Sequence, residues 1–304
     1  MPALAETRGP PVHIIFPFAA GSSSDALARI IAGELGAGLG RPVSVEPRPG
    51  AGGRIGVRAV KQAEPDGNTL LLTPIAPMAV YQSVYPSLDY DPVKDFAPIT
   101  LVGTYDFAIA VGSEVPAKTL AELVAWIRVN PAKANYGTPG AGTLPHFLGV
   151  MFARAIEAGM QPVAYNGTAP LLADLIGGRI PVIVHATNEL VEMQKAGRIR
   201  VLATSGLERS EFFADVPTFR EQGYDLQGSG WYGLFAPART PRETIVQLNG
   251  IVAAAFRRKD VAERIGVLGL RPVTTSPGAL AKIQQRDIDL WAPAVKASGF
   301  APSQ

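Results

Sequence analysis

Three segments of this chain run from a short apolar stretch through a loop of Gly, Ser and Thr into an amphipathic stretch. They are HIIFPFAAGSSSDALARIIAGEL from His13, NYGTPGAGTLPHFLGVMFARAI from Asn135 and QPVAYNGTAPLLADLIGG from Gln161. Each pattern predicts a strand that leads into the N-terminus of a helix. The first N–H groups of a helix lack partners within it and carry the positive end of its dipole, so they favour a carboxylate or phosphate. We therefore expect a small anionic ligand.

The polar residues of these loops are candidates for holding it. Ser22, Ser23 and Ser24 can cap the first helix and donate hydroxyl groups, and Gly21 lets a ligand approach the backbone closely. In the second loop, Thr143 is the N-cap candidate and His146 falls in the first helical turn. In the third, Thr168 is the expected cap, preceded by Tyr165 and Asn166. Two interpretations stay open for each loop, a ligand site or an ordinary helix cap, and for His146 a ligand contact or a structural role.

The residue types give little support to catalysis, metal binding or dinucleotide binding. Cysteine is absent, which excludes disulfides, thiolate catalysis and Cys-ligated metals. The three histidines form no His-x-x-x-His pair, and the chain has no Gly-x-Ser-x-Gly elbow. PGAGGRIG, from Pro49 to Gly56, follows a turn rather than a strand, so we interpret it as a connector that lets the next helix pack closely and not as a dinucleotide site. We predict no catalytic residues, no metal and no cofactor.

Charge and hydropathy argue against two further classes of protein, those that bind nucleic acids and those that span a membrane. The 28 basic and 26 acidic residues are scattered, which argues against a nucleic-acid partner. The longest uncharged run, Asn68 to Leu88, contains three prolines and cannot form one membrane-spanning helix. At the start, Ala3-Leu4-Ala5 followed by Glu6 fits either the end of a cleaved export signal or an ordinary frayed terminus.

Strands and helices alternate along most of the chain, which predicts an α/β protein with largely parallel sheets. A βαβαβ half is complete by about residue 100, and a second series begins near Phe107. FAIAVGSEVPAKTLAELVAWI from Phe107 is echoed by WYGLFAPARTPRETIVQLNGIV from Trp231, each with a capping box, Thr119 with Glu122 and Thr240 with Glu243. We expect two lobes, 1–103 plus 229–304 and 104–228, joined by crossovers near 103 and 229, with a ligand cleft between their sheets.

Several motifs, in this order, resemble the substrate-binding proteins of tripartite tricarboxylate transporters, also called Bug-type solute receptors. The resemblance runs from about Val12 to Phe300 and rests on Pro17-Phe18 with Gly21 and Asp25, Arg48-Pro49-Gly50-Ala51-Gly52-Gly53-x-Ile55-Gly56, Pro65-Asp66-Gly67-x-Thr69-Leu70-Leu71, Tyr90-Asp91-Pro92-x-Lys94-Asp95-Phe96, Gly140-x-Gly142-Thr143-x-x-His146, Asp215-Val216-Pro217-Thr218 and Trp231-Tyr232-Gly233. It implies the two-lobed type II architecture of periplasmic binding proteins, with two mixed or parallel sheets flanked by helices.

The resemblance also implies which residues bind ligand. They are Phe18, Ala19, Ala20, Gly21, Ser22, Ser23, Ser24, Thr73, Ile75, Met78, Gly142, Thr143, His146, Tyr165, Asn166, Thr168 and His185. Ser22 stands where the family usually has glycine, and His185-Ala186 where it usually has aspartate and asparagine. Because histidine offers no negative charge to a ligand ammonium group, we expect an acid without an amine. The apolar loop from Thr73 to Met78 suggests an apolar or aromatic body on that acid.

The function implied is that of a monomeric periplasmic receptor, exported and freed of its signal peptide, which closes on a small organic acid and delivers it to membrane transporter subunits. The alternative is an enzyme on the same scaffold that acts on a small carboxylate with His146 or His185 as base.

Overall fold

The computed structural model describes residues 9–300 and shows an α/β protein. The chain forms two compact units, of which the first holds the described residues up to Thr104 and Trp231–Trp291, and the second holds Tyr105–Gly230 and the residues from Ala292 onward. The sequence analysis had assigned the last of these residues to the first lobe. The Ala3-Leu4-Ala5 and Glu6 segment, considered above as the end of an export signal, lies outside the described residues.

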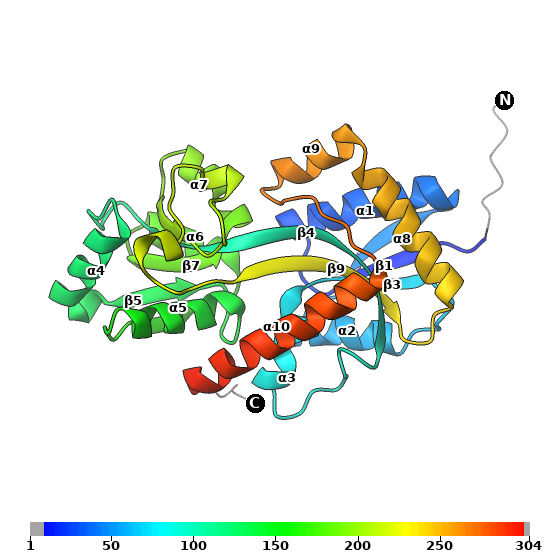
Figure 1. The fold of residues 1–304 in the computed structure, drawn as a ribbon, viewed down its shortest axis with the longest axis horizontal. Coiled ribbons are helices and arrows are strands. Elements are labelled where there is room, and N and C mark those ends of the chain that lie inside the picture. The colour runs from blue at the N-terminus through cyan, green and yellow to red at the C-terminus, as the bar shows by residue number, and fades with distance from the viewer. Residues whose placement is uncertain (1–8, 301–304) are drawn as a thin grey trace. The chain divides into compact units, whose positions relative to one another are not determined.

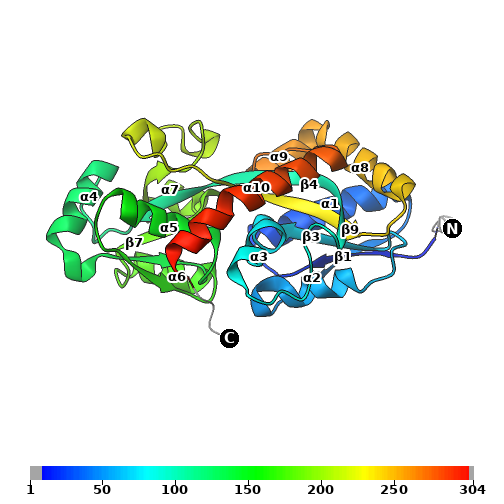
Figure 2. The ribbon, with the colours of Figure 1, turned by 60° about the horizontal axis from the view of Figure 1, so that its bottom comes forward.

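The sheet of the first unit has the strand order β2-β1-β3-β9. β1 (Val12–Phe16) is parallel to β2 (Val43–Pro47) and to β3 (Thr69–Pro74), and β3 is antiparallel to β9 (Ser229–Pro237). The connections β1-α1-β2 and β2-α2-β3 run in opposite directions along the sheet, so right-handed crossovers put their helices on opposite faces. Figure 2 shows α1 (Ser23–Leu39) and α2 (Arg54–Lys61) on either side of these strands.

The remaining helices of the first unit lie around this sheet. α1 packs against α8 (Arg242–Phe256) and α9 (Lys259–Val267) (Figure 1). The uncharged run that follows β3 forms one π-helical turn, η2 (Ala76–Val80), and the short α3 (Tyr81–Val84). α10 (Pro277–Ser298) begins in this unit and continues into the residues of the second.

One predicted capping box is wrong. α8 has Pro241 as its N-cap residue, and the hydroxyl of Thr240 is buried without a hydrogen-bond partner among the described residues. Pro241, which lies between the two expected partners, is the N-cap residue, with the non-helical ψ of 139° that this position requires.

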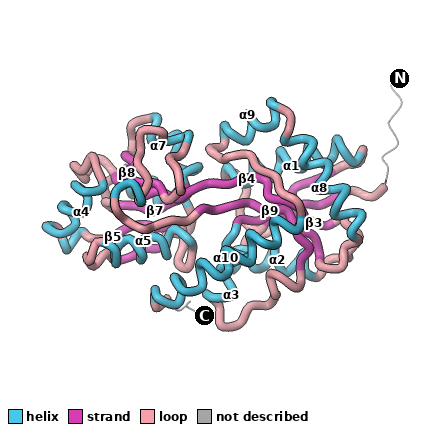
Figure 3. Tube along the Cα trace, in the orientation of Figure 1, coloured by secondary structure: helices cyan, strands magenta, loops and turns pink. Residues whose placement is uncertain are grey.

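The second unit holds a mixed sheet in the order β8-β4-β7-β5-β6. Its strands are β4 (Phe96–Val111, which begins in the first unit), β5 (Asn135–Thr138), β6 (Gln161–Ala164), β7 (Val182–Ala186) and β8 (Arg200–Thr204). β5 is parallel to both β6 and β7, whereas β4 is antiparallel to β7 and β8. Figure 3 shows the connection from β8 to β9 as largely loop, with only the short turns η5 (Glu211–Phe213) and η6 (Arg220–Gln222).

The helices that lie wholly in the described part of this unit are α4 (Leu120–Val129), α5 (Leu144–Ala155), α6 (Thr168–Ile176) and α7 (Val191–Lys195). The short turns η3 (Pro131–Lys133) and η4 (Thr187–Glu189) complete its regular structure, as η1 (Ala51–Gly53) does in the first unit. The Thr119 box is confirmed at α4, because the hydroxyl of Thr119 accepts from the backbone N–H of Glu122 at 3.2 Å. The carboxylate of Glu122 in turn accepts from the N–H of Lys118 at 2.7 Å.

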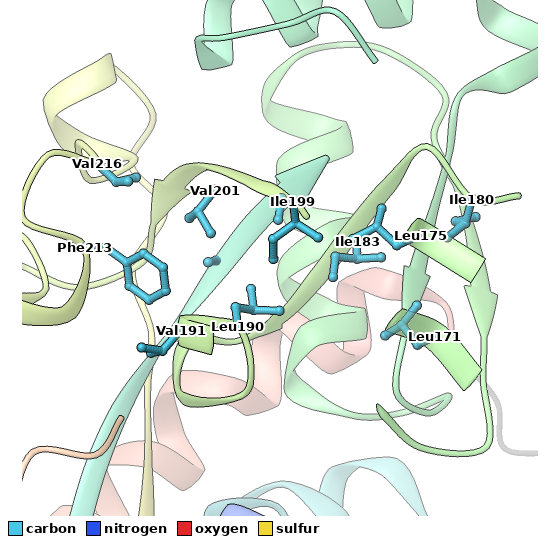
Figure 4. Close-up of a cluster of buried hydrophobic side chains, with 12 residues drawn as sticks. Leu171, Leu175, Ile180, Ile183, Leu190, Val191, Ile199, Val201, Phe213 and Val216 are labelled. Atoms are coloured by element: carbon cyan, nitrogen blue, oxygen red, sulfur yellow. The ribbon is translucent and has the colours of Figure 1, made fainter. Parts of the chain in front are cut away.

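One apolar core of the second unit lies between α6 and the sheet (Figure 4). Leu171 and Leu175 of α6, Ile183 of β7 and Val201 of β8 belong to this core, and all four side chains are at most 4% exposed. Burial of such side chains contributes roughly 1.5–3 kcal/mol each. This packing holds the N-terminus of α6 at a set position relative to the end of β7.

Within residues 9–300, no helix combines the length and the apolar character that crossing a membrane requires.

Candidate functional site

The first unit presents two candidate segments at one edge of its sheet. The loop from Phe18 to Ser24 follows β1, and the segment from Thr73 to Met78 begins at the end of β3. β1 and β3 are parallel neighbours with Ile15 opposite Leu71, so both segments leave the sheet at its carboxyl edge. We call these residues the first-unit cluster. Ligands of open α/β sheets bind at such carboxyl edges.

The loop after β1 forms a glycine turn into α1. Gly21 has φ +95°, a value that a side chain would strain, and Ser22 at φ −88° is the N-cap. The hydroxyl of Ser22 accepts from the N–H of Asp25 at 3.3 Å and lies 2.8 Å from the hydroxyl of Ser24. The serine that replaces the family's glycine therefore needs no positive φ and caps the helix.

Asp25, which the sequence analysis did not include among the site residues, holds this turn from the other side. Its buried carboxylate accepts from the N–H of Gly21 at 3.1 Å and pairs with Arg29 at 3.1 Å. The sequence signal was its place in the first helical turn, where acidic residues stabilise the dipole.

The glycine-rich connector supports the same loop. A Cβ on Gly56 would lie 2.9 Å from the Cα of Pro17, and one on Gly53 would lie 3.0 Å from the ring of Phe18. The close packing expected of PGAGGRIG is confirmed, and it is the Pro17-Phe18 start of the candidate loop that α2 packs against.

The side chains of Thr73, Ile75 and Met78 are fully buried. The carbonyl of Met78 accepts from the side-chain amide of Gln284 at 2.9 Å, and that of Pro77 accepts from the hydroxyl of Tyr90 at 2.8 Å. α10 and the Tyr90 loop thus hold this segment in place. Phe18 is half-buried and Ala19, Ala20 and Gly21 are exposed.

The second unit gathers three candidate segments at one edge. Because β5 is parallel to β6 and β7 in the order β7-β5-β6, the turn before α5, the turn before α6 and His185 of β7 all lie at the carboxyl edge of these strands. We call them the second-unit cluster. The sequence analysis had assigned all three segments to the site, and the sheet brings them together within this unit.

The turn before α5 repeats the one before α1. Gly142 has φ +71°, and Thr143 at φ −87° and ψ 163° is the N-cap, as predicted, against −88° and 168° for Ser22. The hydroxyl of Thr143 does not cap the helix, however. It donates to the carbonyl of Gly140 at 2.8 Å and lies 3.1 Å from the hydroxyl of Thr138.

His146 occupies the first turn of α5 and is 7% exposed. Its Nδ1 accepts from the N–H of Gly142 at 3.1 Å, and its ring packs against Phe147 and Phe300. Burial lowers the pKa of His146, so the neutral ring is favoured. The hydroxyl of Tyr136, a residue of β5, donates to the carbonyl of His146 at 2.9 Å. Sequence reasoning did not find Tyr136, because only the pairing of β5 brings it under α5.

The expected capping role of Thr168 is wrong. Gly167 is the N-cap of α6, and Thr168 is the first helical residue. The hydroxyl of Thr168 lies instead 3.1 Å from Nε2 of His185. Loop geometry decides this, since Gly167 adopts φ +101° and its N–H donates to the carbonyl of Pro139.

His185 is a neutral hydrogen-bond donor at this edge. It is 3% exposed, and burial lowers its pKa to about 4 from the ordinary 6.5. Its Nδ1 accepts from the N–H of Ala186 at 2.7 Å, so the ring proton is on Nε2 and points to Thr168. Because Thr168 then accepts from His185, its own hydroxyl proton is left for an acceptor other than His185.

Tyr165 and Asn166 flank this turn. The hydroxyl of Tyr165 donates to Asp174 at 3.0 Å, and Asp174 also pairs with Arg179 at 2.7 Å, so the Tyr165 hydroxyl is engaged within the unit. Asn166 is exposed. Across residues 9–300, no group of three or more His, Asp or Glu side chains is arranged to hold a metal ion.

Solved structures of similar chains define the class. The fold superposes on MatC (Rpa3494) of Rhodopseudomonas palustris with bound malate, at a TM-score of 0.84 and 29% identity, over 94% of this chain and 98% of that one. It superposes on Rpa4515 of R. palustris with adipate at a TM-score of 0.90 and 28% identity, over 96% and 98%. It also superposes on the periplasmic binding protein BugD at a TM-score of 0.86 and 30% identity, over 96% of this chain and 99% of that one. The fold, with helix N-termini gathered at sheet edges, is that of a periplasmic binding protein.

The family model of the tripartite tricarboxylate transporter family receptor matches residues 27–300. BugT of Bordetella pertussis is 32% identical over 291 residues, which cover 95% of this chain and 89% of that protein. The chain therefore belongs to the tripartite tricarboxylate transporter receptor family, whose members are periplasmic solute receptors that work with membrane transporters. The resemblance drawn from the sequence motifs is confirmed.

Proposed function

We propose that this protein captures a small carboxylic acid without an amino group and delivers it to membrane transporter subunits. The observation that carries the proposal is the chemistry of the second-unit cluster. The N-termini of α5 and α6 supply hydrogen-bond donors and the positive ends of two dipoles. The Nε2–H of His185 donates to Thr168, which leaves the hydroxyl proton of Thr168 as a further donor for the ligand. Relatives solved with malate and with adipate support a carboxylate as ligand.

The finer parts of this function are proposals as well. The seventeen ligand residues named from the sequence would hold the acid, with lobes 1–103 plus 229–304 and 104–228 closing on it. The protein would act as a monomer, exported and freed of its signal peptide.

Binding without turnover fits the two candidate histidines better than catalysis does. The low pKa of His185, about 4, makes its ring a weak base at neutral pH. Nδ1 of His146 is already engaged by Gly142. We infer that the wild-type protein returns a bound acid unchanged, and detection of a product that disappears in H146Q or H185Q would favour the enzyme alternative.

A thermal-shift screen tests the ligand class. Malate or adipate at a hundred times its Kd should stabilise the protein by about 2.7 kcal/mol, which corresponds to about 5–10 °C in Tm. Aspartate and glutamate, which match these acids in charge at the carboxylates but add an ammonium group, should give a clearly smaller shift. Larger shifts with the amino acids, or no shift with any carboxylate, would contradict the proposal.

The selectivity should reverse when a negative charge replaces the His185 donor. In H185D, a carboxylate would face the ligand carboxylate, and affinity for dicarboxylates should fall about a hundredfold, because like charges at a buried site repel strongly. H185N, which is neutral, is the matched control and should lose much less. Titration calorimetry measures both, and equal losses would show that charge at this position does not select the ligand.

A further inference from the structure

Among the described residues, the helices α1, α4 and α5 have the same type of hydrogen bond at their N-termini. In each, the third residue of the helix accepts from the N–H of the residue before the N-cap. Asp25 accepts from Gly21 at α1, Glu122 from Lys118 at α4, and His146 from Gly142 at α5, at 3.1, 2.7 and 3.1 Å. The arrangement resembles the reciprocal half of a capping box, which ordinarily employs Glu or Gln.

The three acceptors differ in charge. Asp25 and Glu122 are carboxylates, which place a negative charge on the positive end of the dipole of their own helix. His146 makes the same bond with a ring nitrogen that carries no proton, so it satisfies the N–H of Gly142 without adding charge. The α5 N-terminus therefore keeps its positive potential, whereas a carboxylate at this position would offset it.

The surroundings of His146 do not supply the missing charge. Its ring contacts the rings of Phe147 and Phe300, and the side chain is 7% exposed. The turn that it holds has the same backbone form as the turn at α1, where Arg29 balances Asp25. The cap of α5 therefore has the same geometry as the cap of α1 but carries no negative charge.

We propose that His146 is a positioning residue that fixes the Gly142-Thr143 turn as a neutral cap and so keeps the N-terminus of α5 attractive to the ligand carboxylate. This inference rests on the proposed function and assigns to His146 a role that it exerts through Gly142. It accounts for an imidazole at the helix position where α1 and α4 have carboxylates.

Two isosteric variants separate charge from geometry. Asn and Asp both place an oxygen close to the position of Nδ1, so H146N and H146D should each preserve the bond from Gly142. We expect H146D to bind the best carboxylate about tenfold more weakly than H146N, with a difference that shrinks in high salt, because the added charge opposes the helix dipole. Thermal unfolding of the two variants checks that both are folded; H146D should be at least as stable, since acidic residues suit the first turn.

E122Q is the control, because it removes the charge of the equivalent cap at α4, far in sequence from the candidate segments, and should leave affinity unchanged. Nitrogen NMR of the wild-type imidazole should show a proton on Nε2 and none on Nδ1 at neutral pH. Equal affinities of H146D and H146N, or a protonated Nδ1, would overturn this inference alone. A wild-type protein that binds no carboxylate would overturn the proposed function and this inference together.

Discussion

Between pH 7 and pH 4, the wild-type protein should lose about 3 kcal/mol of unfolding free energy relative to H185Q. His185 has a folded-state pKa of about 4 and an ordinary value of 6.5. As the pH falls below 6.5, His185 becomes protonated in the unfolded chain, whereas in the folded protein it stays neutral down to about pH 4. The free energy of unfolding therefore decreases between pH 6.5 and pH 4. At 1.36 kcal/mol for each pKa unit, the difference amounts to about 3 kcal/mol.

Urea unfolding of both proteins at several pH values measures this difference. The comparison with H185Q cancels the titration of the carboxylates, which both proteins share. The physical cause is burial, because the His185 ring is 3% exposed and desolvation disfavours its charged form. Parallel stability profiles for the two proteins would contradict a buried neutral His185, and with it the donor that the second-unit cluster requires.

Replacing Gly149 with alanine should destabilise the second unit by about 2 kcal/mol. Gly149 lies in α5, and an added Cβ would come within 2.1 Å of the ring of Tyr136, which is fully buried. Overpacking of this kind costs up to about 3 kcal/mol, of which alanine's better helix propensity recovers about 1. Because Tyr136 also donates to the carbonyl of His146, carboxylate affinity should fall as well.

Replacing Gly250 in α8 with alanine should have the opposite effect on stability. An added Cβ there has no heavy atom within 4 Å beyond its chain neighbours and the backbone of its own helix. G250A should therefore stabilise the protein by roughly 0.5–1 kcal/mol. Denaturant unfolding compares the two, and a G149A protein as stable as the wild type would show that Tyr136 can move aside at little cost.

Local sequence signals located the elements of the fold well. The serines from Ser22 to Ser24 predicted the start of α1, where the structure selects Ser22 as the N-cap, and the predictions at Thr143 and at the Thr119 box are confirmed. These signals work because a capped turn is held by residues within about five positions of one another. The same signals gave the wrong cap residue at Thr240 and Thr168, because Pro241 and Gly167 are the N-cap residues there.

The candidate site could be predicted as a set of loops but not as a set of bonds. The alternation of strands and helices was enough to predict that candidate segments follow strand ends, and the motifs were enough for the family. The bonds of Gly142 to His146 and of Ala186 to His185 are local, but the pairing of Thr168 with His185 joins residues of two different elements. No periodicity or spacing indicates such a pairing.

The sequence by itself determined the helix starts, the neutral residue types at the α5 and α6 turns and the absence of cysteine chemistry, because these depend on residue identity and short-range geometry. Only the tertiary structure decided that both histidines are buried as neutral rings and that Thr168 meets His185. The reason is that the neutral ring follows from burial, and both burial and the Thr168–His185 pairing depend on how α5 and α6 pack on β5, β6 and β7.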